Sequence, residues 1–266
     1  MVILKIGGGS AINLAGIVAD MAELADSAGP FIIVHGANAL RDSLAEQLGT
    51  PKQVVTSTSG YSSVLSDQHA IDVILMSYAG LRNKRLVELC QREGINAVGL
   101  TGLDGRAVNG ERNKGIRVRE NNKNIIKRDF SGKARTVNGP LLTLLLDNGY
   151  TPVLTIPIAD ERGYAVNSEN DDIVNALQAA IQANTVVQFI EAPGFLEDAA
   201  DDASALATME RAEVAMREQQ VEGRMKRKML ALRTLVQTGV ERVIIADGRT
   251  EHPLRDALNG RGTHIS

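Results

Sequence analysis

Residues 2–10 read VILKIGGGS, so a short apolar run carries one lysine and continues directly into three glycines and a serine. Glycine permits a tight turn and lets backbone N–H groups approach an anion, and a helix that follows such a turn points its positive end at the same place. The spacing matches neither a P-loop nor a dinucleotide-binding fingerprint. The stretch therefore indicates a strand-to-helix turn that is either a phosphate site or an ordinary α/β connection.

The composition indicates a globular protein with a sizeable core. The chain has 266 residues, 44% hydrophobic and 23% charged, which fits one large α/β domain or two small lobes. No apolar run approaches the roughly 20 residues that span a bilayer, and no signal peptide is recognisable, so we expect a cytoplasmic protein without a membrane segment. The single cysteine, Cys90, cannot form an internal disulfide, and its apolar surroundings indicate core packing.

Continuous apolar runs alternate with segments of helical periodicity along the whole chain. This pattern predicts an α/β fold, a three-layer α/β/α sandwich with a mostly parallel central sheet. The predicted strands are 2–4, 31–34, 97–100, 151–154, 186–190 and 242–245. The predicted helices are 11–28, 38–48, 67–93, 138–148, 171–183 and 224–238.

Residues 108–135 interrupt this rhythm with short alternating pieces, which predicts a β-hairpin insertion over 115–127. Residues 106–135 hold ten Lys and Arg against three Asp and Glu, so this segment carries about +7 and the remainder about −10. The asymmetry indicates an acidic partner or a solvated insertion. A nucleic-acid partner is disfavoured, because aromatic residues make up only 3% of the chain.

Three further clusters sit at predicted helix starts. The turn at 35–38 (HGAN) is either a second strand-to-helix connection or an anion-binding turn beside the first. Residues 167–172 (NSENDD) precede a helix, and we interpret Asn170 and Asp172 as capping and first-turn residues. Residues 223–228 (GRMKRK) place four cations at a helix N-terminus, which is unfavourable unless an anion binds there.

Taken together, these motifs resemble the amino acid kinase family over essentially the whole chain. The matching residues are 5–8 (KIGG), 35–36 (HG), 80–84 (GLRNK), 97–105 (AVGLTGLDG), 167–171, 223–228 and 262–263. Within that family the chain resembles the kinases that act on aminoadipate or glutamate tethered to the amino-group carrier protein LysW, more than those acting on free N-acetylglutamate. The resemblance implies a phosphotransferase that moves the γ-phosphoryl group of ATP onto a side-chain carboxylate.

The resemblance also implies roles for residues. Lys5 and Lys228 match the family's phosphate-binding lysines, and Asp171 matches the aspartate that positions them, giving a predicted catalytic set. Backbone groups of the two turns are expected to bind phosphate, with Gly36 and Ala37 also facing the substrate; the expected phosphate-binding residues are Gly7, Gly8, Gly36 and Ala37. Magnesium is expected to arrive with ATP, because the ion dehydrates reluctantly, and no protein metal site is expected.

The acceptor and nucleotide positions depart from the family pattern. Asn167 matches the residue that holds the acceptor, but Val64 stands where related kinases carry an arginine that clamps the substrate α-carboxylate. In the 35–37 turn, Ala37 stands where the family pattern has a second glycine. The nucleotide segment reads IEAPG over 190–194, with Glu191, Gly194 and Met225 as the expected nucleotide-binding residues. These departures leave the acceptor open.

The basic hairpin then predicts a docking site for a small acidic carrier protein, through Arg117, Arg119, Lys127 and Arg128. Two lobes on a single continuous sheet are expected, 1–165 for the acceptor and 166–266 for the nucleotide, in a homodimer. The alternatives are a kinase for free N-acetylglutamate, a kinase with a redesigned acceptor pocket, and a ligand-sensing protein without activity.

Overall fold

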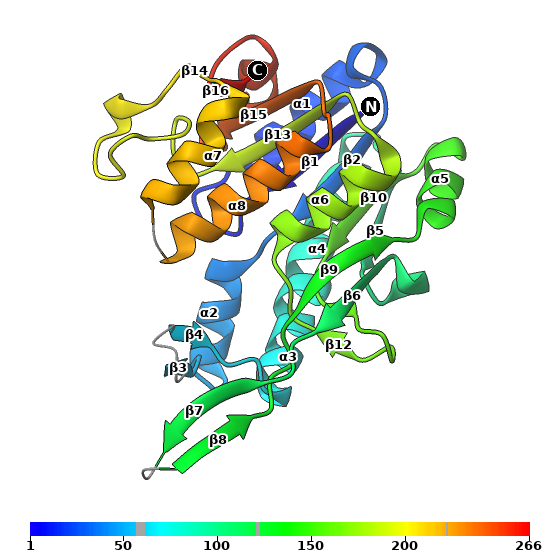
Figure 1. The fold of residues 1–266 in the computed structure, drawn as a ribbon. Coiled ribbons are helices and arrows are strands. Elements are labelled where there is room, and N and C mark those ends of the chain that lie inside the picture. The colour runs from blue at the N-terminus through cyan, green and yellow to red at the C-terminus, as the bar shows by residue number, and fades with distance from the viewer. Residues whose placement is uncertain (57–61, 121–122, 222) are drawn as a thin grey trace.

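The computed structural model describes residues 1–56, 62–120, 123–221 and 223–266; the side chains of 56, 62, 63, 120 and 223–225 are outside that description. Its centre is an eight-stranded sheet of order β14-β16-β15-β13-β1-β2-β10-β5 (Figure 1). The strands are β1 (Val2–Ile6), β2 (Phe31–His35), β5 (Ala97–Thr101), β10 (Thr151–Thr155), β13 (Thr185–Ile190), β14 (Thr208–Met209), β15 (Arg242–Asp247) and β16 (Thr263–Ile265).

The sheet is mostly parallel because its central strands are apolar on both faces. β1 pairs in parallel with β2 on one side and β13 on the other, and β15–β16 is the antiparallel pair. Successive residues of β1 enter different cores: Ile3 packs in one, and Val2 and Leu4 in the other. A strand buried on both faces is typical of a helix-covered parallel sheet.

Helices cover both faces and complete three layers. One core joins the sheet to α1 (Leu14–Ala28), α4 (Asn83–Arg92) and α9 (Pro253–Leu258). The other joins it to α5 (Gly139–Asp147), α6 (Asn170–Ile181), α7 (Arg211–Gln220) and α8 (Gly223–Gln237). The predicted fold class is confirmed, and Cys90 is buried in the first core as expected.

Smaller elements lie beside the carboxyl ends of β2 and β10. After β2 come α2 (Asn38–Gln47), the hairpin β3 (Val54–Thr56) and β4 (Ser62–Val64), then α3 (Gln68–Ile74) and a π-helical segment, η1 (Leu75–Arg82). A four-stranded sheet contains β6 (Val108–Arg112), β9 (Gly132–Val137), β11 (Ile158–Ala159) and β12 (Ala165–Val166). Two 3₁₀ turns span Asp104–Arg106 and Asp202–Ser204.

The predicted hairpin insertion is confirmed. β7 (Ile116–Glu120) and β8 (Lys123–Lys127) pair antiparallel and project from the body of the protein (Figure 1). Residues 121 and 122, which the sequence pattern places in its turn, lie outside the described residues. Among the described residues, no helix is long and apolar enough to cross a membrane.

A buried carboxylate ties the first helix to the last. Asp20 of α1 is fully buried and accepts hydrogen bonds from the backbone N–H groups of Leu254 (2.9 Å) and Arg255 (3.0 Å) at the start of α9. His252 Nδ1 lies 3.0 Å from the same carboxylate. The side chain therefore satisfies donors that the helix itself leaves open.

We predict that Asp20→Ala lowers the free energy of unfolding by about 2–4 kcal/mol, because the amide donors lose their buried charged acceptor. Chemical denaturation measures the change. Asp26→Ala, at an exposed position on the same helix, is the matched control and should stay within about 0.5 kcal/mol of the parent. Equal stability of the two variants would contradict the assigned role of Asp20.

Candidate functional site

The turns that follow β1 and β2 touch each other at the carboxyl edge of the sheet. A Cβ atom on Gly8 would lie 2.5 Å from the backbone nitrogen of Asn38 and 2.8 Å from that of Ala37. A Cβ atom on Gly36 would lie 2.9 Å from the backbone nitrogen of Gly8. Side chains are therefore excluded at both positions, and two sets of backbone amides meet at one point.

The hydrogen bonds distinguish which of these amides can bind an anion. The N–H groups of Gly7 and Gly36 donate to Phe189 O and Ile6 O, each at 2.9 Å, so they hold the turns to the sheet. The amides of Gly7 and Gly36 are therefore used within the sheet in this structure, and the phosphate-binding role expected of these two residues stays a prediction. The N–H groups of Gly8 and Ala37 donate to no backbone carbonyl of the described residues, although the Ala37 backbone also lies against the Tyr78 hydroxyl. Together with the start of α2, these two amides form a site suited to phosphate.

The structure brings Lys5 and Asp171 together at this junction. Lys5 Nζ lies 3.0 Å from Asp171 Oδ1, and the side chains are only 13% and 20% exposed. Asp171 stands in the first turn of α6, so its carboxylate is also compatible with the helix dipole. The ion pair fixes the lysine at the end of β1, beside the two turns.

Asn170 is a further residue at the junction, and its interpretation as a helix cap is wrong. The N-cap residue of α6 is Glu169, which makes no capping hydrogen bond through its side chain. Asn170 Oδ1 is buried without a partner among the described residues, and Nδ2 would lie 3.3 Å from a Cβ on Gly36. An orphaned polar atom in a site is available to a ligand. Asp172 does lie in the first turn, and burial raises its pKa.

Lys228 lies on the neighbouring helix rather than in the ion pair. It is exposed on α8, and within the described structure it contacts neither Lys5 nor Asp171. α8 packs beside α6, where Asn175 Nδ2 donates to Ala231 O at 3.1 Å, one turn beyond Asp171 and Lys228 (Figure 1). The predicted second cation is therefore near the site, with its side chain in solvent.

The three predicted nucleotide residues differ in their surroundings. Glu191 follows β13, and its Oε1 accepts a hydrogen bond from Ala11 N at 2.6 Å, so its carboxylate lies against the first glycine turn. Gly194 packs on β16, where a Cβ atom would lie 2.6 Å from Thr263 Oγ1. Met225 belongs to α8, but its side chain is outside the described structure.

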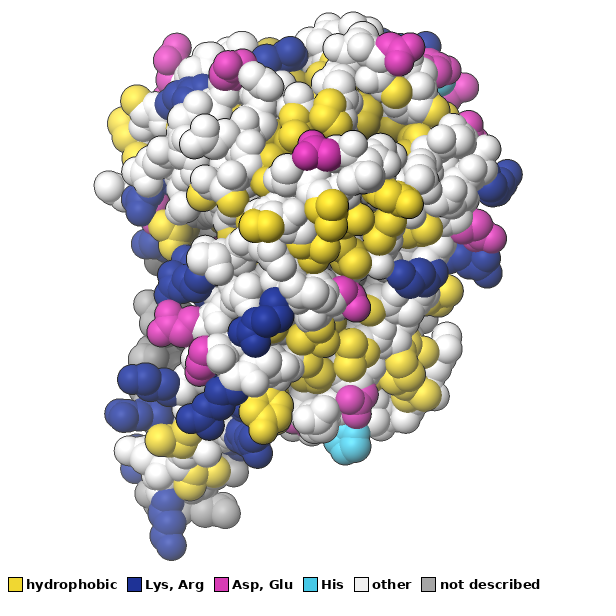
Figure 2. All heavy atoms as spheres, turned by 90° about the vertical axis from the view of Figure 1, so that its right-hand side faces the viewer, with side chains coloured by type: hydrophobic (Ala, Val, Ile, Leu, Met, Phe, Trp, Pro, Cys, Tyr) yellow, Lys and Arg dark blue, Asp and Glu magenta, His cyan; other side chains and the backbone are white. Residues whose placement is uncertain are grey.

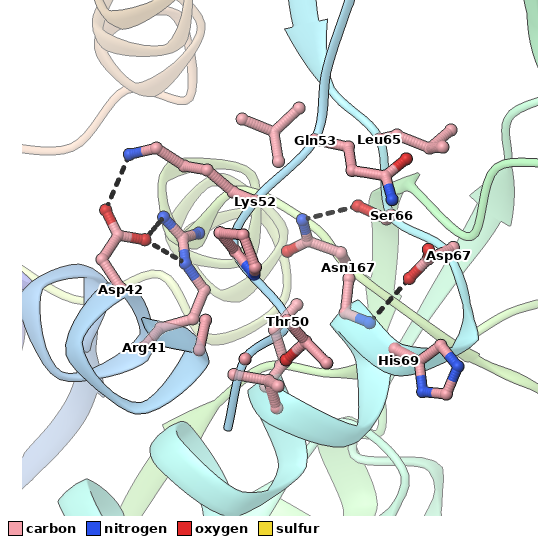
Figure 3. Close-up of a pocket in the computed structure, with 17 residues that line it drawn as sticks. Arg41, Asp42, Thr50, Lys52, Gln53, Leu65, Ser66, Asp67, His69 and Asn167 are labelled. Atoms are coloured by element: carbon pink, nitrogen blue, oxygen red, sulfur yellow. Dashed lines mark hydrogen bonds and ion pairs between the residues drawn. The ribbon is translucent and has the colours of Figure 1, made fainter. Parts of the chain in front are cut away.

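A pocket of about 330 Å³ lies between α2, the β3–β4 hairpin, α3 and Asn167 (Figure 3). The pocket contains both predicted acceptor positions, Val64 and Asn167. Asn167 Nδ2 donates to Ser66 Oγ at 3.1 Å, which holds its amide against the wall of the pocket. Arg41, Asp42 and Lys52 also line it, and sequence reasoning missed all three.

The basic hairpin is attached to this pocket by its stem. Phe130, three residues beyond β8, donates from its N–H to Ser66 O and accepts from Asn167 N, both at 2.7 Å. Asp129 Oδ1 accepts from Ser66 N at 2.9 Å. The two pocket residues are thereby fixed to the segment that carries the hairpin.

The four predicted docking cations do not share one face of the hairpin. Arg117 and Arg119 are exposed and lie two residues apart on β7, so they share one face of the hairpin. Lys127 pairs with Ile116 and therefore lies on the other face. Arg128 lies over the ring of Phe130, 4.8 Å from its centroid. Figure 2 shows the Lys and Arg side chains gathered on the projecting hairpin.

A neutral histidine supports the second turn. His35 ends β2 and is fully buried; Asn83 Nδ2 lies 3.1 Å from its Nε2 and donates to Val153 O at 3.0 Å. Because Asn83 Nδ2 is a donor, His35 Nε2 is an acceptor and the proton lies on Nδ1. Burial lowers the pKa of His35 to about 3.

The sequence profile described as "Amino acid kinase family" matches residues 1–247. The chain therefore belongs to the amino acid kinase family. It is 40% identical over 268 residues to the LysW-aminoadipate kinase of Thermus thermophilus, with both chains covered in full. It is 31% identical over 267 residues to the acetylglutamate kinase of Methanopyrus kandleri, again with both chains covered in full.

Solved structures share the fold at low identity. The crystal structure of smu.665 from Streptococcus mutans UA159 superposes with a TM-score of 0.76 at 17% identity, covering 100% of this chain and 98% of that one. The common architecture therefore extends over the whole chain.

The buried state of His35 predicts a pH dependence of stability. The unfolded chain binds a proton on this histidine below its ordinary pKa of 6.5, whereas the folded protein does not until about pH 3. Stability should therefore fall as the pH drops below 6.5, by about 1.4 kcal/mol per pH unit, or about 2 kcal/mol at pH 5.

Urea unfolding at pH 7.5 and pH 5 of the parent and of His35→Gln measures this contribution. The variant should lose less stability between the two pH values than the parent does. His69→Gln, at an exposed histidine, is the control and should behave like the parent. An identical pH dependence in His35→Gln would contradict the assignment.

Proposed function

We propose that the protein is an ATP-dependent kinase that phosphorylates the side-chain carboxylate of 2-aminoadipate or glutamate carried by the amino-group carrier protein LysW, in lysine or arginine biosynthesis. The observation that carries the proposal is the arrangement at the end of β1. The Lys5–Asp171 pair lies at the end of β1, where the turns containing Gly8 and Ala37 meet. The helix that starts after Ala37, α2, lines a pocket whose wall is hydrogen-bonded to the stem of the basic hairpin. The full-length similarity to a LysW-aminoadipate kinase supports the choice of acceptor.

The chemistry needs positioning and charge stabilisation more than proton transfer. A carboxylate oxygen of the acceptor attacks the γ-phosphorus of ATP, the bond to the β–γ bridging oxygen breaks, and ADP leaves. The carboxylate is already ionised, so no general base is required. Lys5, held by Asp171, and the amides of Gly8 and Ala37 stabilise the charge on the transferring oxygens.

The two halves of the chain take different substrates in this proposal. In this proposal, residues 1–165 form the acceptor lobe and residues 166–266 form the nucleotide lobe. Lys228 acts from the nucleotide side once its exposed side chain turns toward the phosphates, and Gly194 and Met225 contact the nucleotide. Glu191, next to the glycine turn, limits how close the phosphates approach. Magnesium arrives on ATP, bound by phosphate oxygens and water.

The carrier docks on the basic hairpin. Its stem is bonded to Ser66 and Asn167, so a carrier bound there presents its attached amino acid at the mouth of the pocket. An acidic protein is attracted by the excess positive charge of residues 106–135. Arg117 and Arg119, on one exposed face, are the principal docking residues, and Arg128 and Lys127 contribute from the stem and the opposite face.

A homodimer is the proposed assembly, built on the acceptor lobe. β5 is an outer strand of the large sheet, and exposed apolar side chains, Leu144 (60%) and Tyr150 (38%), lie on and just beyond the nearby helix α5. Figure 2 shows hydrophobic side chains spread over this side of the molecule. Sedimentation equilibrium tests the proposal, and a monomer at micromolar concentration would reject it.

Free N-acetylglutamate is the second candidate acceptor, favoured by the similarity to an acetylglutamate kinase. The discriminating assay supplies ATP, Mg²⁺ and hydroxylamine with each acceptor and traps the acyl phosphate as a hydroxamate. We expect product from LysW-bound aminoadipate or glutamate. Product from free N-acetylglutamate alone would reverse the choice, and no product from any acceptor would favour a ligand-sensing protein.

In the same assay, Lys5→Met should lower kcat by about 10²–10³-fold, because a preorganised charge at the transferring group is lost. Thermal unfolding should show that the variant remains folded. Undiminished turnover in this variant would place the phosphoryl transfer elsewhere in the molecule.

Carrier docking predicts a charge-dependent KM. Arg117→Glu with Arg119→Glu should raise the KM for the carrier-bound acceptor at least tenfold and leave the KM for ATP unchanged, and added salt should raise the parent's KM for the same acceptor. Arg85→Glu with Arg92→Glu, two exposed positions on α4, makes the same change in net charge as a control. Equal KM values for the two double variants would leave the hairpin as a solvated insertion.

A further inference from the structure

An arginine of α2 lies in the acceptor pocket, where Val64 offers only an apolar side chain. Arg41 lines the pocket together with Val64 and Asn167, and its side chain is 22% exposed (Figure 3). It comes from a different element than Val64, since α2 forms one wall of the pocket and the β3–β4 hairpin another. The pocket therefore contains a guanidinium group despite the valine.

The arginine is held in place by two neighbours. Arg41 Nε and Nη2 donate to Asp42 Oδ1 at 2.9 and 2.7 Å, and Lys52 Nζ donates to Asp42 Oδ2 at 2.9 Å. Adjacent side chains on a helix normally diverge, so this pairing fixes the guanidinium in one orientation. Arg41 Nη1 makes no hydrogen bond with the described residues, which leaves donors for a ligand.

The charges of this cluster favour an anion. Burial would raise the pKa of Asp42, but hydrogen bonds from Lys52 and Arg41 outweigh it and lower that pKa, so the carboxylate is ionised. Two cations then share one carboxylate, and the cluster of Arg41, Asp42 and Lys52 keeps one net positive charge. Asp67, which also lines the pocket, is occupied in capping α3, where it accepts from Ala70 N at 2.8 Å.

The position of the cluster matches the length of an amino dicarboxylic acid. Ala37 ends the phosphate-binding turn and Arg41 lies four residues later, about 6 Å along the helix axis. Ala45, one turn further along α2, also lines the pocket, so the pocket extends along the helix away from the turn. An acceptor with its reacting carboxylate at Ala37 would place a second carboxylate near Arg41. An amino acid tethered through its amino group retains that α-carboxylate.

We propose that Arg41, oriented by Asp42 and Lys52, binds the α-carboxylate of the amino dicarboxylate acceptor. The arginine supplies the bidentate fork that carboxylates favour, from α2 instead of from position 64. This inference rests on the proposed function and adds the residue that selects the acceptor. Asn167, which also lines the pocket, then provides a second contact with the acceptor.

The first experiment compares Arg41→Met with the parent, using LysW-bound 2-aminoadipate in the hydroxamate assay. Loss of a charge-assisted pair should raise the KM for this acceptor by about 10- to 100-fold, with the KM for ATP within twofold of the parent. Arg41→Lys, which keeps a charge but not the fork, should give an intermediate KM. Arg85→Met, at an exposed arginine of α4, is the control and should match the parent.

The second experiment asks whether Arg41 recognises the carboxylate itself. The parent should discriminate against a carrier-bound acceptor whose α-carboxylate is replaced by a carboxamide, and Arg41→Met should lose most of that discrimination. Adding Val64→Arg to Arg41→Met should recover at least part of the lost affinity, because it restores a guanidinium to the same pocket. A merely structural role for Arg41 would give neither result.

The outcomes separate this inference from the proposed function. If the parent turns over the carrier-bound acid and Arg41→Met has an unchanged acceptor KM, the inference is wrong and the proposed function stands. If the parent shows no turnover with carrier-bound acids, the proposed function is wrong and the inference falls with it. A raised KM with retained discrimination against the carboxamide would also reject the role of Arg41.

Discussion

The close approach of two glycine turns at the carboxyl ends of β1 and β2 is the constraint on which the site depends. Gly8 and Gly36 meet with no room for a Cβ atom on either, and Gly7 and Gly36 bind their turns to the sheet through their own amides. The backbone nitrogens of Gly8 and Ala37 are thereby brought close together. Parallel pairing of β1 and β2, which follows from their apolar sequences, sets this geometry.

Charge is then added to this backbone frame from distant parts of the sequence. Asp171 arrives on α6 and fixes Lys5, and α6 also brings Asn170 to the junction. On the acceptor side, α2 continues from the second turn and carries Arg41 into the pocket, while the segment after β8 links the basic hairpin to Ser66 and Asn167. The proposed phosphate site, the acceptor pocket and the proposed carrier-docking hairpin are thus connected by short stretches of chain.

The sequence predicted the elements that depend on local pattern. The six predicted strands and the hairpin insertion are present, because continuous apolar runs and strict alternation are strong signals. The short strands β3, β4, β14 and β16 were missed, since two or three residues carry little periodicity and their pairing depends on distant partners. Residues 67–93 read as one helix, yet η1 interrupts its regular hydrogen bonding.

Site residues that belong to a sequence motif could be predicted. Roles that depend on contacts in the folded protein were harder to predict. The Lys5–Asp171 juxtaposition follows from the motifs, but the use of the Gly7 and Gly36 amides within the sheet could only be seen in three dimensions. No motif in the sequence singles out Arg41. Its one available signal was its place a single turn after the second glycine turn, and its pairing with Asp42 runs against the usual divergence of adjacent helical side chains.

The most direct test of the central claim is a crystal structure of the protein with ADP, Mg²⁺, aluminium fluoride and LysW-bound 2-aminoadipate. The planar aluminium fluoride group imitates the phosphoryl group in transit. We expect this group to lie within hydrogen-bonding distance of the N–H groups of Gly8 and Ala37 and of Lys5 Nζ. An aluminium fluoride group bound away from these three donors, with the turns of β1 and β2 empty, would contradict the central claim.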